Sequence, residues 1–182
     1  MNKSANAGIN EPVSISETLV DLHTQLSSGD PSVQSAAYDD LLSIANQGSS
    51  EAMFLVARCL MSGRGVEPNQ VDGHKWLEHA VSATPPSRAA FHTLGMLHIN
   101  SIVEIPIPDY GIGLIARAYE LGHLAALTDL LRLCNSSEHQ LKAQKATYRV
   151  LGSQAALPGA SKVLEEFKLF CRAFKTSELL DS

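Results

Sequence analysis

Histidine and cysteine are the residues of this sequence with which metal binding or catalysis could begin, seven of the first and three of the second. Two histidine pairs lie close together in the chain, His74 with His79 and His92 with His98. Spacings of five and six residues place neither pair on one helical face, as the four-residue spacing of a zinc-binding HExxH motif would. No cysteine or carboxylate stands at a matching spacing, so we predict no metal site and no cofactor.

Other catalytic or phosphate-binding motifs are incomplete. The run from Gly111 to Gly113 lacks the preceding strand and the third glycine of a dinucleotide-binding loop, and we interpret it as a close-packing point in a helix. The loop from Gly63 to Gly65 lacks the Lys-Ser/Thr pair of a phosphate loop. Because the chain also has no GxSxG nucleophile elbow, we predict that it is not an enzyme.

Composition narrows the function classes further. Of the 182 residues, 45% are hydrophobic, which is enough to bury a core. The net charge of −5 argues against nucleic-acid binding, which needs clustered Lys and Arg, and favours a basic protein partner. No apolar run approaches the ~20 residues that span a bilayer. The N-terminus also lacks the apolar region of a secretory signal. We therefore expect a soluble, bacterial, cytoplasmic protein without membrane contact.

The three cysteines lie far apart among apolar neighbours, which is typical of buried thiols in a reducing compartment. They are Cys59, Cys134 and Cys171.

Apolar residues recur every three or four positions along most of the chain, and Gly or Pro interrupts this pattern at regular intervals. Ser16 is the expected N-cap of the first helix, and Asp30 with Pro31 opens the second. The run from Ser101 to Pro108 is read as an extended loop because its prolines cannot donate to a strand. The sequence therefore predicts an all-α fold, with helices at 16–26, 31–47, 51–62, 71–83, 87–99, 110–121, 123–134, 138–157 and 160–175.

Self-comparison reveals a repeat. The pattern that begins at Ala52 recurs at Ala90, 38 residues later, and similar unit endings stand near Gly48, Gly122 and Gly159. One such unit cannot bury its apolar face alone, so neighbouring units must stack. We predict one domain, 14–175, with units at 14–48, 49–84, 85–122 and 123–159, a capping helix at 160–175, a disordered leader at 1–13 and a tail at 176–182.

The second unit resembles the Sel-one-like repeat, a relative of the tetratricopeptide repeat. The residues that match the family pattern in register are Ala52, Phe54, Gly63, Gly65, Val66, Trp76 and Ala80. The resemblance implies a right-handed α-solenoid of about four antiparallel helix hairpins. It also implies a protein-interaction scaffold or adaptor that is not catalytic. Gly63, Gly65, Trp76 and Ala80 are expected to be structural.

Partner-binding residues of such a stack would lie on its concave face, on the first helix of each hairpin. Residues at the same position in the first helix of successive units form rows across this face. These rows contain aromatic and arginine side chains, which contribute most of the binding energy at protein interfaces. The predicted partner contacts are Met53, Arg58, Phe91, His92, Met96 and Arg132. The alternative interpretation is that Phe91 and the methionines belong to the core. An alternative function is an immunity protein or inhibitor that neutralises a bacterial toxin or effector by direct binding.

Overall fold

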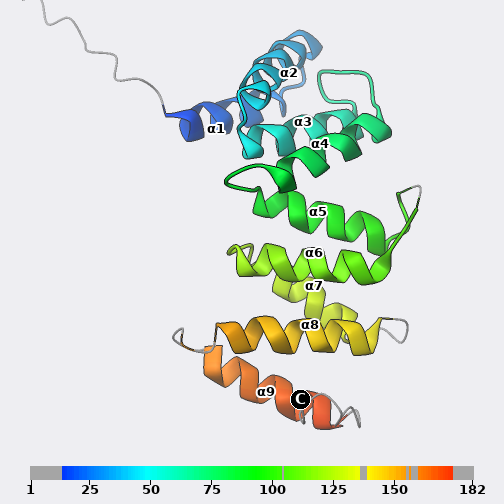
Figure 1. Ribbon diagram of the computed structural model, residues 1–182. Helices are drawn as coiled ribbons and strands as arrows, with labels where there is room; N and C mark the ends of the chain where they lie inside the picture. The colour runs from blue at the N-terminus through cyan, green and yellow to red at the C-terminus, as the bar shows by residue number, and fades with distance from the viewer. Residues whose placement is uncertain (1–13, 104, 136–138, 155, 157–159, 174–182) are drawn as a thin grey trace, which may run out of the picture.

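The computed structural model describes residues 14–103, 105–135, 139–154, 156 and 160–173 (Figure 1). The predicted leader and tail lie outside these residues. The described residues form α-helices and no strands, which confirms the all-α prediction. The helices are α1 (Ile15–Gln25), α2 (Pro31–Asn46), α3 (Ser50–Ser62), α4 (Gln70–Ser82), α5 (Arg88–Ile99), α6 (Pro108–Glu120), α7 (Ala125–Leu133), α8 (Gln140–Ser153) and α9 (Ala160–Ala173).

Side-chain caps set several helix starts. Asp30 accepts a hydrogen bond from the Ser32 N–H, and Pro31 follows it as predicted. Ser49 caps α3 in the same way. The cap of α1 is Ser14 rather than Ser16, because Ser14 forms a reciprocal capping box with Glu17. Of the two nearby serines, only Ser14 has a carboxylate three residues later in the chain, and this carboxylate completes the cap.

The helices pack mainly on their neighbours in the chain (Figure 1). Each of the four predicted hairpins has its two helices in contact, α9 packs on α8, and the order of contacts is consistent with a helical repeat. Hydrophobic side chains between the helices form the core, which lies in three clusters along the stack. Helix α6 is buried on several sides, with Ile112 and Ile115 fully enclosed.

Two glycines allow α5 and α6 to approach each other closely. A Cβ atom built on Gly95 would lie 2.7 Å from the carbonyl oxygen of Gly111, and one built on Gly111 would lie 2.6 Å from the carbonyl oxygen of Gly95. The interpretation of the Gly111 run as a close-packing point is thus confirmed for Gly111. It is wrong for Gly113, around which there is open space.

The loop glycines of the second unit are structural, as the sequence predicts. Gly63 ends α3 in the left-handed conformation, with φ of 71°. Gly65 has φ of +73°, and its α-carbon lies against the backbone carbonyl of Gln34 in α2, where a Cβ atom would overlap. Trp76 packs against two of the core clusters, and Ala80 is fully buried.

Among the described residues, no helix combines the length and the apolar character needed to cross a membrane. All three cysteines are buried, in agreement with the prediction. Burial raises the pKa of the Cys59 and Cys134 thiols to about 11.

Candidate binding groove

The three apolar residues predicted as partner contacts are half-buried. Met53 packs against the clusters on both sides of α3, and Phe91 and Met96 pack against the cluster centred on α6. Their packing agrees with the alternative interpretation, in which they belong to the core. Their part in partner binding stays a prediction.

Of the polar predicted contacts, Arg58 and Arg132 are exposed, whereas His92 is half-buried. Arg58 is exposed on α3, with its guanidinium 5.7 Å from the centre of the Phe54 ring. His92 of α5 and Arg132 of α7 are brought together by Asp129. One carboxylate oxygen lies 2.7 Å from His92 Nε2, and the other lies 2.9 Å from an Arg132 nitrogen.

Asp129 and His123 complete this cluster and were missed by the sequence analysis. The His123 ring lies 4.8 Å from the His92 ring, and its pKa is lowered by burial and by the neighbouring His92. The separation of 37 residues between His92 and Asp129 is about one repeat, which is the signal that could have linked them. Through these polar contacts the cluster joins α5 and α7, the first helices of two successive hairpins.

A recess lies between α4 and α6. Helix α6 packs directly on α8, whereas α4 and α6 make little direct contact although both pack on α5. The space between α4 and α6 is a cavity of about 520 Å³, floored by the C-terminal end of α5 and bordered by four residues of the α5–α6 loop, Ile102, Val103, Ile105 and Ile107. We call it the α4–α6 groove. Its lining residues are Met61, Gln70, Val71, His74, Lys75, Glu78, Leu97, His98, Ile102, Val103, Ile105, Ile107 and Tyr110.

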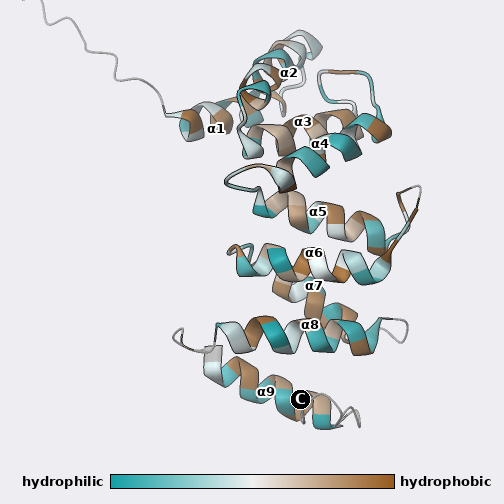
Figure 2. Cartoon of the chain, in the orientation of Figure 1, coloured by the Kyte–Doolittle hydropathy of each residue, from teal (hydrophilic) through white to brown (hydrophobic). Residues whose placement is uncertain are grey.

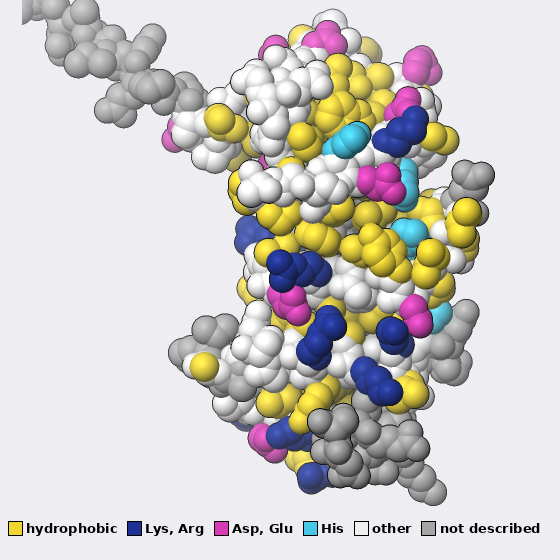
Figure 3. Space-filling model, in the orientation of Figure 1, with side chains coloured by type: hydrophobic (Ala, Val, Ile, Leu, Met, Phe, Trp, Pro, Cys, Tyr) yellow, Lys and Arg dark blue, Asp and Glu magenta, His cyan; other side chains and the backbone are white. Residues whose placement is uncertain are grey.

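The rims of the α4–α6 groove expose large apolar side chains. Ile105 is 73% exposed, Val71 is 66% exposed and Ile102 is 61% exposed. The α5–α6 loop is largely hydrophobic (Figure 2). Hydrophobic side chains also gather over α5, α6 and this loop on the molecular surface (Figure 3). Apolar side chains that gather around a recess, unlike scattered ones, mark binding surfaces.

Hydrogen bonds donated by backbone N–H groups hold the α5–α6 loop in place. The Ile102 N–H donates to the Leu97 carbonyl oxygen, and the Ile107 N–H donates to His98 Nδ1 at 3.3 Å. Pro108 then occupies the first turn of α6, where its missing N–H costs nothing. The loop is therefore fixed at both ends to α5 with its isoleucines facing outward.

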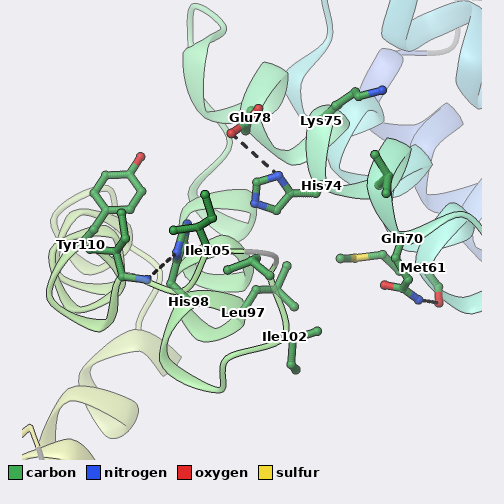
Figure 4. A pocket seen from close by; sticks show the side chains of 13 residues that line it. Met61, Gln70, His74, Lys75, Glu78, Leu97, His98, Ile102, Ile105 and Tyr110 are labelled. Carbon is green, nitrogen blue, oxygen red and sulfur yellow. Dashed lines mark hydrogen bonds and ion pairs between the residues drawn. The ribbon is translucent and has the colours of Figure 1, made fainter.

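Two histidines form the polar centre of the groove (Figure 4). His98 is only 8% exposed, and burial together with the nearby His74 lowers its pKa. Because Nδ1 of His98 accepts a hydrogen bond, the proton of the neutral ring sits on Nε2. The Tyr110 ring meets the His98 ring edge-on at 5.1 Å.

His74 lies between Glu78 and His98 (Figure 4). Its Nδ1 is 3.8 Å from a Glu78 carboxylate oxygen, and its ring centre is 6.1 Å from that of His98. Its Nε2 is buried without a hydrogen-bond partner among the described residues. A buried polar atom left in this way is costly, and a bound group that supplied the missing hydrogen bond would be stabilised.

None of the described residues that line the α4–α6 groove is a serine, threonine or cysteine that the histidines could activate. Across the described part of the chain, no three His, Cys, Asp or Glu side chains are grouped so that they could hold a metal ion.

The sequence predicts an extended loop between α5 and α6, but the groove beside it was not predicted. The signal was present, because a loop with three isoleucines at exposed positions is unusual unless it contacts something. The sequence matches no family model and no curated protein. The resemblance to Sel-one-like repeats therefore rests on residues of the sequence alone, chiefly those of the second unit and, more weakly, Ala90, Leu94, Gly95, Ala118 and Gly122 of the third.

Proposed function

We propose that this chain is a non-catalytic protein-interaction scaffold of the Sel-one-like type, a right-handed solenoid of helix hairpins that binds a protein partner. The glycines of the α3–α4 loop, Trp76 and Ala80 support the repeat assignment, since they occupy the structural positions that the repeat pattern gives them. Sequential helix packing is consistent with it.

The observation that carries the proposal is the exposed apolar rim of the α4–α6 groove. Burial of an isoleucine or valine side chain contributes about 1.5–3 kcal/mol. Val71, Ile102 and Ile105 are each already partly covered, so a partner that buried all three would gain about twice that amount at one place. The exposed arginines Arg58 and Arg132 are a second surface that such a partner would contact.

A photo-crosslinking amino acid placed at Ile105 tests the proposal in cells. We expect a discrete protein adduct from this position. The matched control is Val20 of α1, which is 68% exposed and far from the groove in the chain, and it should give no such adduct. Absence of an adduct at 105, or the same adducts from both positions, would count against binding in the groove.

The stoichiometry of the captured complex separates the adaptor from the inhibitor. The acidic charge favours a basic partner in both cases. Several partners of moderate affinity support an adaptor. A single toxin held tightly at one-to-one stoichiometry, with its activity suppressed, supports the immunity protein.

A further inference from the structure

The α4–α6 groove has the size and composition of a ligand site. Its cavity of about 520 Å³ falls within the usual range of roughly 300–1,000 Å³ for binding pockets. Its lining is mostly apolar, with a few polar groups at the centre. The question that remains is which chemical group these residues would select.

The charges at the groove favour a basic group. Lys75 is neutralised by Asp72, whose carboxylate lies 2.8 Å from the ammonium nitrogen. Glu78 is 59% exposed, and its carboxylate lies 3.8 Å from Nδ1 of His74. Because no lysine or arginine among the described residues forms an ion pair with Glu78, this carboxylate can pair with a cation that enters the groove.

His98 offers a hydrogen-bond donor at the centre of the groove. It presents an Nε2–H donor, since its Nδ1 is occupied by the Ile107 N–H. Nε2 of His74 is buried and has no hydrogen-bond partner among the described residues, so it is not exposed to an incoming chain. The His98 donor matches the C=O group of an extended peptide backbone.

We propose that the α4–α6 groove binds a linear segment of a partner protein that combines apolar side chains with a lysine or arginine. This inference rests on the proposed function and adds the chemistry of the partner. The apolar side chains would cover Ile102 and Ile105, the basic residue would meet Glu78, and a backbone carbonyl of the segment would accept a hydrogen bond from His98. A second copy of this chain, with net charge −5, matches Glu78 less well.

Selection of a random 12-residue phage-displayed peptide library on the purified full chain tests this directly. Enriched peptides are expected to share apolar residues and at least one lysine or arginine. Synthetic versions should bind at least tenfold more weakly to Ile105→Asp, whereas Leu169→Asp, a change at an exposed leucine of α9, should leave binding unchanged. Glu78→Lys should reverse the preference from basic to acidic peptides.

Three results would overturn the inference: enriched peptides that are acidic or uncharged, equal binding to Ile105→Asp, or self-association of the chain that Ile105→Asp abolishes. If peptides bind but lose affinity only in Arg58→Glu or Arg132→Glu, the groove inference fails while the proposed function stands. If no peptide is enriched and crosslinking at 105 captures no partner, both fail.

Discussion

Replacing Gly95 by alanine tests the close packing that places the floor of the groove. The added Cβ atom would lie 2.7 Å from the Gly111 carbonyl oxygen and 2.7 Å from an Ile115 side-chain carbon. Ordinary contact begins near 3.4 Å, so α5 and α6 would have to separate by several tenths of an ångström. Backbone atoms cannot rotate away as the end of a flexible side chain can.

The expected magnitude combines two opposing effects. Overpacking a well-packed interface costs about 1–3 kcal/mol. Removing a glycine from a helix interior recovers about 0.5–1 kcal/mol. The net loss should be about 1–2 kcal/mol in the free energy of unfolding. For a chain of this size, this lowers Tm by about 2–8 °C.

Urea unfolding followed by circular dichroism measures this change. The matched control is Gly113→Ala in the neighbouring helix α6, where a Cβ atom meets nothing within 4 Å. This control should gain about 0.5–1 kcal/mol, because only the propensity term acts. Equal stability of the Gly95→Ala and Gly113→Ala proteins would refute the close-packing argument.

Three further predictions concern substitutions at Gly65, at His98, and at Arg58 and Arg132. Gly65→Ala should lower Tm by more than Gly95→Ala, because it adds a strained positive φ to an overlap with the Gln34 carbonyl, and thermal unfolding measures the difference. Burial lowers the pKa of His98 in the folded state, so the unfolded chain takes up the proton first and stability should fall as pH drops below about 6.5. Replacement of His98 by glutamine should flatten this dependence in urea titrations at several pH values. Charge reversal at Arg58 and Arg132 should weaken partner binding while changing Tm little, since both side chains are exposed; unchanged affinity would remove them from the interface.

Much of the fold was predictable because local signals agree with packing. Gly and Pro at unit ends, and caps such as Asp30 and Ser49, mark most helix boundaries. The prediction was too long for α8, which was expected to extend to residue 157 but ends at Ser153. The helix includes Gly152, a residue that weakens helices, directly before this end.

The binding surface was harder to predict because it depends on distances between helices. Sequence periodicity identifies which residues are apolar, but it does not say that α4 and α6 diverge while α6 and α8 pack. Similarly, the hydrogen bond between His92 and Asp129 joins residues on different hairpins. Met53, Phe91 and Met96 were chosen by residue type, and only the packing around them shows that they are half-buried.

The central claim is that a protein partner binds in the α4–α6 groove, and calorimetry with the partner captured at position 105 tests it most directly. Ile105→Asp should bind at least about tenfold more weakly than the unchanged chain, since burial of an isoleucine contributes about 1.5–3 kcal/mol and a carboxylate would be buried in its place. Leu169→Asp should bind with unchanged affinity. Equal affinity of all three proteins would contradict the account.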